Sequence, residues 1–206
     1  MSKNKVDIVF KIITIGDSNV GKTSIIRRYT YNIFEPESIS TIGVSFSFKE
    51  VTLENGITVK LKLVDTAGQE KFKSVTKSYY KNTDGVLFVF AYDKKRTFED
   101  ISDWIQNFED NNNTGNIPRY LLGNKNDLEN KVVTEDSIND FLNKHKGKYK
   151  FESTSASENT NIDKVFKELA EDMYKNYLTS ANKGQSQRQI LKTNNNSKRN
   201  NCICTL

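Results

Sequence analysis

The chain has 206 residues, with 31 Lys and Arg against 26 Asp and Glu for a formal net charge of +5, and it holds one His and two Cys. With 35% apolar and 11% aromatic residues, it can bury one good core, which excludes fibrous and wholly disordered proteins. Apolar runs such as 86–92 are far shorter than the roughly 20 residues of a membrane-spanning helix, and the polar amino terminus lacks a signal-peptide pattern. We expect an intracellular protein.

The positive charge is concentrated at the carboxyl-terminal end. Residues 179–206 contain basic side chains but no Asp or Glu, and without their charge residues 1–178 are formally neutral. The segment is also rich in Asn and lacks regular apolar periodicity, which is typical of disordered chain. The sequence therefore predicts a folded domain over 1–178 and a flexible basic tail over 179–206.

Strands and helices alternate along the domain. Near-continuous apolar runs, separated by segments of helical periodicity, indicate crossover units that cover both faces of a mostly parallel sheet. The expected strands are 6–15, 44–53, 57–64, 86–92, 120–123 and 149–152, and the expected helices are 22–31, 97–108, 135–144 and 162–178. The predicted fold class is α/β, with six strands and helices on both faces.

One strand pair is expected to be antiparallel. Asn55 and Gly56 separate the extended segments 44–53 and 57–64, and both residues tolerate positive φ, which favours a tight hairpin. One strand of the six should therefore run against the others.

A phosphate-binding motif follows the first expected strand. Residues 16–23 match GxxxxGK[ST] and lead into the first expected helix. In this motif glycines let backbone N–H groups surround the phosphates, Lys22 reaches the β- and γ-phosphates, and the Thr23 hydroxyl ligates Mg²⁺. The motif predicts a P-loop NTPase and leaves kinase, ATPase and GTPase open.

Two later motifs narrow the nucleotide. Asp65 begins the sequence Asp-Thr-Ala-Gly-Gln-Glu at a strand end, where a carboxylate can support Mg²⁺. Asn124, Lys125 and Asp127 follow the fifth strand, at the edge where open α/β sheets bind ligands. A carboxylate at Asp127 can accept hydrogen bonds from N1–H and the exocyclic amine of guanine, whereas adenine leaves it unpaired. The three motifs together predict a guanine nucleotide.

On these residues the chain resembles the small GTPases of the Ras superfamily and, within it, the Rab branch, over about residues 6–178. The Rab-like stretches are 42–46, 71–75, the tyrosine pair at 79–80 and the cysteines at the carboxyl end. The chain is a divergent member, because it departs from the usual Rab pattern at Asn19, Ser38, Val64 and Ser157. The resemblance implies the G-domain version of the P-loop fold.

The resemblance also assigns roles to individual residues. Catalysis falls to Lys22, Thr41 and Gln69, with Gln69 orienting the attacking water, and Mg²⁺ binding falls to Thr23, Thr41 and Asp65. Nucleotide contacts are expected from Asp17, Ser18, Asn19, Val20, Gly21, Lys22, Thr23, Ser24, Phe34, Gly68, Asn124, Lys125, Asp127, Ser155 and Ala156. The expected ligands are Mg²⁺ and GTP or GDP.

The resemblance implies a switch that works with partners. Segments 34–46 and 65–81 are expected to be ordered with GTP and released with GDP. The expected partners are a guanine nucleotide exchange factor, a GTPase-activating protein, effectors, a GDP-dissociation inhibitor and the prenylation machinery, acting on a monomer. No arginine lies between residues 29 and 95, so we expect slow intrinsic hydrolysis, on the order of 10⁻⁴ to 10⁻³ s⁻¹.

Cys202 and Cys204 indicate a membrane anchor. A CaaX signal has its cysteine fourth from the end, and that position is Ile203; the Cys-x-Cys pair instead resembles the double prenylation sites of Rabs. Two lipid chains, or one chain with a basic segment, anchor stably. The expected location is the cytoplasmic face of an intracellular membrane, with cycling through the cytosol.

Alternative functions have less support. A nucleotide-binding scaffold with little hydrolysis is suggested by the departures at Val64 and Ser157, although Lys22, Thr41 and Gln69 are retained. A P-loop kinase is disfavoured by the guanine-type motif at 124–127. Nucleic-acid binding is compatible with the net charge, but the basic tail has no aromatic residue on which bases could stack, so we expect no nucleic acid.

Overall fold

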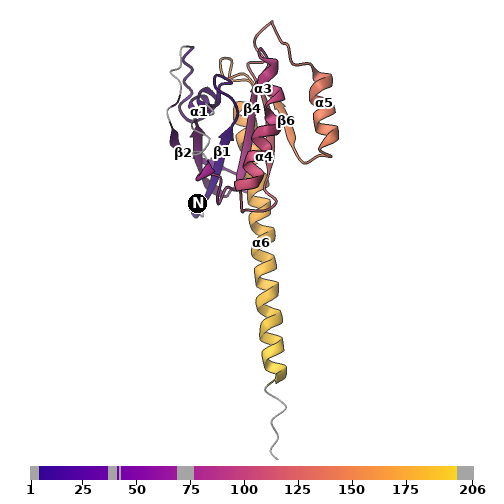
Figure 1. Ribbon diagram of the computed structural model, residues 1–206. Helices are drawn as coiled ribbons and strands as arrows, with labels where there is room; N and C mark the ends of the chain where they lie inside the picture. The colour runs from indigo at the N-terminus through magenta and orange to yellow at the C-terminus, as the bar shows by residue number, and fades with distance from the viewer. Residues whose placement is uncertain (1–4, 37–40, 42, 69–76, 199–206) are drawn as a thin grey trace, which may run out of the picture. The chain divides into compact units, whose positions relative to one another are not determined.

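The structure is a computed structural model that describes residues 5–36, 41, 43–68 and 77–198. Its centre is a six-stranded sheet in the order β2-β3-β1-β4-β5-β6 (Figure 1). The strands are β1 (Lys5–Ile15), β2 (Val44–Thr52), β3 (Thr58–Thr66), β4 (Gly85–Ala91), β5 (Arg119–Asn124) and β6 (Lys150–Ser153). Neighbouring strands are parallel except for β2 and β3, which are antiparallel. The predicted fold class, strand number and single antiparallel strand are confirmed.

The helices bury apolar side chains against the sheet. They are α1 (Lys22–Tyr31), α3 (Lys95–Glu99), α4 (Ile101–Asn111), α5 (Glu135–Lys144) and α6 (Ile162–Lys198). Trp104 of α4 and Ile138 of α5 share a buried cluster with Phe88 of β4. Tyr29 of α1 and Phe166 of α6 stack at 3.9 Å between ring centroids. Strand β4 is buried along its whole length, because both of its faces are covered.

The hairpin between β2 and β3 differs from the expected two-residue turn. Gly56 N–H donates to the Leu53 carbonyl at 2.9 Å, which places Glu54 and Asn55 at the centre of the turn. Gly56 alone of the pair has a positive φ, 81°, and Asn55 Oδ1 accepts from the Ile57 N–H at 3.0 Å. The prediction of an antiparallel pair was right, but its turn lies one residue earlier.

Two helices also differ from the sequence prediction. The expected helix 97–108 consists of α3 and α4, which meet at Asp100. Helix α6 continues beyond Leu178 to Lys198, where the sequence predicted irregular chain. Residues 179–198 contain no proline and one glycine, so nothing in the backbone chemistry forces an end at Leu178.

The chain forms two units, Met1–Met173 and Tyr174–Leu206. The expected boundary at residue 178 and the flexibility of the tail remain predictions. Within the described part of the chain, no helix combines the length and apolar character that crossing a membrane requires.

Candidate functional site

The phosphate-binding loop joins β1 to α1 and has an unusual backbone. Gly16, Asn19 and Gly21 have φ values of 150°, 62° and 95°. A Cβ at Gly16 would lie 2.1 Å from the Val89 carbonyl oxygen, so no larger residue fits there. Asn19 stands where Rab-like chains usually have another glycine, and asparagine is among the residues that best tolerate positive φ. The loop therefore keeps its path despite this departure.

Lys22 is the first residue of α1, and its side chain points back into the phosphate loop. Its side chain is buried, and its Nζ donates to the carbonyls of Gly16 at 2.8 Å and Asp17 at 2.6 Å. Burial lowers the pKa of Lys22 to about 8, although the Asp65 carboxylate acts in the opposite direction. This amine is a concentrated positive charge among backbone dipoles, which is the arrangement that phosphate oxygens require.

Three residues expected to bind Mg²⁺ meet beside the loop. Thr23 Oγ1 donates to Asp65 Oδ2 at 2.7 Å and lies 2.7 Å from Thr41 Oγ1. Burial raises the pKa of Asp65, while the Thr23 hydrogen bond and the Lys22 charge oppose that shift. Asp65 Oδ1 is buried and has no hydrogen-bond partner within the described residues. Two hydroxyls and a carboxylate are the hard oxygen donors that Mg²⁺ prefers, so this set fits the ion.

The segment after Asp65 lies directly against the phosphate loop. A Cβ at Gly68 would come within 2.3–2.4 Å of the Asp17 and Ser18 backbone. Glycine is therefore the one residue that allows this approach. The contact places the start of the expected second switch segment at the loop. Gln69, which follows, lies outside the described residues.

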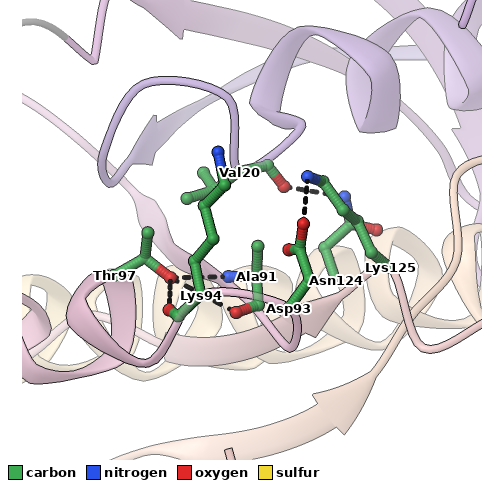
Figure 2. A network of polar contacts seen from close by, with 7 residues as sticks. All are labelled: Val20, Ala91, Asp93, Lys94, Thr97, Asn124 and Lys125. Atoms are coloured by element: carbon green, nitrogen blue, oxygen red, sulfur yellow. Dashed lines mark hydrogen bonds and ion pairs between the residues drawn. The ribbon is translucent and has the colours of Figure 1, made fainter. Parts of the chain in front are cut away.

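The motif at 124–127 is tied to the loop and to the sheet (Figure 2). Asn124 is buried, and its Nδ2 donates to the Val20 carbonyl at 2.8 Å. Lys125 has a φ of 64°, and its Nζ lies 3.1 Å from Asp93 Oδ2, just beyond β4. Asn124 therefore positions the loop, and Asp93 holds the Lys125 side chain.

Figure 2 also shows how the end of β4 is fixed. Thr97 of α3 accepts a hydrogen bond from the Ala91 N–H at 3.0 Å and donates to the Lys94 carbonyl at 2.7 Å. This turn holds Asp93, the partner of Lys125, between β4 and α3.

A small cluster of hydroxyls surrounds Asp127. Ser155 Oγ donates to Asp127 Oδ1 at 2.6 Å and lies 2.9 Å from Ser157 Oγ. Burial acts to raise the pKa of Asp127, but hydrogen bonds from Ser155 and Ser157 outweigh it and hold that pKa below its usual value. The carboxylate is thus kept ionised and ready to accept hydrogen bonds. The contribution of Ser157, which stands where relatives usually have lysine, was not foreseen from the sequence.

A cavity of about 500 Å³ opens beside this cluster. It brings together residues from the phosphate loop, from the segment after α1 and from the two loops expected to read the base. Its lining consists of Asn19, Gly21, Ser24, Phe34, Glu35, Pro36, Asn124, Lys125, Asp127, Leu128, Ala156 and Ser157. The expected base-binding residues are therefore neighbours in space, and the cavity has the size of a small-molecule site.

Two further residues support the site and were missed in the sequence. Trp104 Nε1 donates to Asp17 Oδ1 at 2.7 Å, and Arg28 Nε donates to the Ala156 carbonyl at 2.8 Å. Each pair is far apart in the chain, so no local motif signals it. Burial raises the pKa of Asp17, and the Trp104 hydrogen bond opposes that shift.

Two of the Rab-like aromatic residues, Phe46 and Tyr79, are in contact with each other. Phe46 and Tyr79 have ring centroids 5.6 Å apart, and Phe46 is 43% exposed. Val64 lies opposite Phe46 in the β2–β3 register and is fully buried, so it belongs to the core. The stretch at 71–75 and the cysteines Cys202 and Cys204 lie outside the described residues.

The fold and the loop define a P-loop nucleotide-binding protein, and comparison with known proteins gives its family. A model of the Ras family matches residues 11–175. Ras-related protein Rab-10 of Diplobatis ommata is 41% identical over 173 residues, which cover 84% of this chain and 85% of that protein. Ras-related protein Rab-13 of Canis lupus familiaris is 41% identical over 169 residues, 81% of each chain. Rab11C of Lotus japonicus is 40% identical over 168 residues, 82% of this chain and 76% of that protein.

The chain belongs to the Ras family and is Rab-related. Members of this family are GTPases, and its membership of the family makes this chain a GTPase. The resemblance drawn from the motifs alone is thus confirmed.

Proposed function

We propose that this protein is a GTP-hydrolysing switch that regulates vesicle and membrane traffic through effectors recognising its GTP-bound form. One observation carries the proposal. The Thr23 hydroxyl lies 2.7 Å from both the Thr41 hydroxyl and an Asp65 carboxylate oxygen. This group lies beside the buried Lys22, at the end of the phosphate loop that also lines the base cavity. These residues come from α1, the segment before β2, and β3. Such an arrangement suits a nucleotide whose phosphates and Mg²⁺ bridge separate segments.

The base end of the site supports guanine. Asp127 is held by Ser155 so that its carboxylate can accept hydrogen bonds from N1–H and the 2-amino group. Phe34 and Ala156 line the same cavity, where the Phe34 ring can pack edge-on against the base and a backbone N–H can donate to O6. Adenine presents an acceptor at N1 and an amine at C6, which would leave both protein groups unpaired.

Hydrolysis requires a water molecule and charge stabilisation. We assign Gln69 to orienting the water, whose oxygen forms a bond to the γ-phosphorus while the bond to the β–γ bridging oxygen breaks. Lys22 stabilises the phosphate oxygens. Thr23, Thr41 and Asp65 would hold Mg²⁺, which would neutralise further charge. The products are GDP and inorganic phosphate.

The γ-phosphate also explains the switch. Thr41 and Gly68 are the residues that would contact it from the two segments 34–46 and 65–81, and those contacts are lost on hydrolysis. The surface of the two segments therefore depends on the nucleotide. Exchange factors, GTPase-activating proteins and effectors are partners that such a surface implies, and the Rab-related sequence favours membrane traffic as the process.

The test begins with the bound nucleotide. Purified protein is denatured and its nucleotide is identified by chromatography; single-turnover GTP hydrolysis is then compared in the native chain and in Gln69→Leu. Guanine nucleotide and a rate near 10⁻⁴ to 10⁻³ s⁻¹ are expected for the native chain, with a loss of about tenfold or more in the variant.

The matched control is Gln106→Leu, which makes the same chemical change at an exposed position on α4. Its rate should equal that of the native chain. Adenine nucleotide would refute guanine recognition, while equal rates in the native chain and Gln69→Leu would favour a nucleotide-binding scaffold. A native rate near 1 s⁻¹ without any partner would contradict the assignment of a slow switch.

A further inference from the structure

Arg28, near the carboxyl end of α1, joins the turn that ends this helix to the loop after β6, 128 residues further along the chain. Its Nε donates to the Ala156 carbonyl at 2.8 Å, and its Nη2 donates to the Ser157 carbonyl at 2.9 Å. Its Nη1 donates to the Asn32 carbonyl oxygen at 3.2 Å and to Asn32 Oδ1 at 3.1 Å. A planar guanidinium with five donors can serve all of these acceptors at once, which the single ammonium of lysine cannot do.

The partners of Arg28 belong to two walls of the base cavity. Ala156 and Ser157 line the cavity on the loop after β6, and Phe34 lines it on the segment after α1. The Arg28 guanidinium carbon lies 5.9 Å from the centroid of the Phe34 ring, which is within reach of a cation–π attraction. One side chain thus contacts both walls.

The contact with Asn32 fixes the path of the chain from α1 to Phe34, which forms one wall of the cavity. Asn32 ends α1 in the left-handed region with a φ of 55°, and its own N–H donates to the Arg28 carbonyl at 2.9 Å. Arg28 and Asn32 therefore bond to each other in both directions. The turn leads directly to Phe34, two residues later.

The bonds to the loop constrain the backbone that directly follows Ala156. Because a peptide unit is planar, holding the carbonyls of Ala156 and Ser157 fixes the planes of two consecutive peptides. Ala156 is almost fully buried, so its carbonyl needs a donor within the protein. These two peptides directly follow Ala156, so holding them limits how far the loop can shift when one of its backbone N–H groups donates to guanine O6.

We propose that Arg28 is a positioning residue for guanine binding, which holds the 155–157 loop and Phe34 in place as two walls of the base cavity. This inference rests on the proposed function, since it concerns the same nucleotide site. Arg28 is not among the residues that line the cavity; it acts through Ala156, Ser157 and Phe34.

The test compares Arg28→Ala and Arg28→Lys with Arg27→Ala as the matched control. Arg27 is the neighbouring residue on α1. It pairs at 2.7 Å with Glu35, which also lines the cavity, but because this ion pair is solvent-exposed its removal should change little. The measurement is the rate at which fluorescently labelled GDP leaves the full-length protein in the presence of excess GDP and Mg²⁺. We expect release about tenfold faster for Arg28→Ala, roughly threefold faster for Arg28→Lys and within about twofold of native for Arg27→Ala.

A second readout separates positioning from general loss of stability. Inosine diphosphate keeps O6 and N1–H of guanine but lacks the 2-amino group that faces Asp127. Arg28→Ala should therefore accelerate the release of GDP and of inosine diphosphate by the same factor and leave their affinity ratio unchanged. The thermal unfolding midpoint with saturating GDP confirms that the variant is folded during the measurement.

Equal GDP release from native protein and folded Arg28→Ala would overturn the proposal, as would equal effects of Arg28→Ala and Arg27→Ala. A changed ratio between the two nucleotides would also overturn it, because the effect would then pass through Asp127. Failure of the native protein to bind GDP would refute the proposed function itself, which is a different result.

Discussion

Lys22 is a buried cation whose ordinary pKa of 10.5 is lowered to about 8 by burial, against the attraction of Asp65. Its two hydrogen bonds to loop carbonyls only partly replace water. The folded nucleotide-free protein therefore holds this proton less tightly than the unfolded chain does.

This difference predicts how stability depends on pH. Between about pH 8 and 10 the unfolded chain keeps a proton that Lys22 has released in the folded state, so the free energy of unfolding rises with pH. The slope from this one group is at most about 1.4 kcal/mol per pH unit. Urea unfolding of the nucleotide-free protein at pH 7, 8 and 9 measures it.

Lys22→Met supplies the control for this dependence. The variant should retain a smaller slope, because burial also lowers the pKa of Lys11, whose contribution has the same sign. Tyr29, whose pKa burial raises, titrates above this window and does not mask the effect. An identical slope in both proteins would show that the Lys22 proton is held equally in the folded and unfolded states.

At the scale of elements, a hydrogen bond from Trp104 joins α4 to the phosphate loop. Trp104 packs in the core cluster of the sheet and its Nε1 reaches Asp17 at 2.7 Å. Trp104→Phe keeps an aromatic ring but removes the donor, so a partly buried carboxylate loses a hydrogen bond. We expect a loss of about 1–3 kcal/mol in unfolding free energy, measured by urea denaturation with saturating GDP.

A double-mutant cycle with Asp17→Ala, which removes the acceptor, isolates this link. If the hydrogen bond carries the effect, the two substitutions together should cost less than the sum of their separate costs. Full additivity would assign the loss to packing of the smaller ring.

The elements also show which local patterns predict well. Strand β4 was evident because a strand covered on both faces needs an unbroken apolar run. The boundary between α3 and α4 at Asp100 was not evident, because both helices present apolar residues to the same core. The hairpin turn was placed wrongly for a related reason: Gly56 permits several turns, and pairing between β2 and β3 selects the one with Glu54 and Asn55 at its centre.

At the scale of the whole molecule, the tail is predicted to act as a membrane tether. Its five positive charges could each add up to about 1 kcal/mol near an anionic leaflet, in addition to lipid on Cys202 and Cys204. Protein from a native source should carry added lipid mass and bind vesicles that contain phosphatidylserine. Raising the salt from about 0.15 to 0.5 M should weaken the binding without abolishing it.

Cys202→Ser/Cys204→Ser is the matched variant for the tether, since it retains every basic residue. It should carry no lipid and lose stable vesicle binding while releasing GDP at the native rate. Native protein without lipid on either cysteine, or equal vesicle binding by the variant, would refute the tether.

The sequence by itself determined the family and the α/β class, and it predicted the residues that carry the phosphate and base motifs. It could do so because glycine, lysine and carboxylate spacings are local requirements of a loop that surrounds phosphate. The tertiary structure decided which distant residues support those motifs: Trp104 for Asp17, Asp93 for Lys125, and Arg28 for the loop at Ala156. These pairs depend on how helices and strands pack, and a contact between residues far apart in the chain leaves no spacing by which the sequence alone could indicate it.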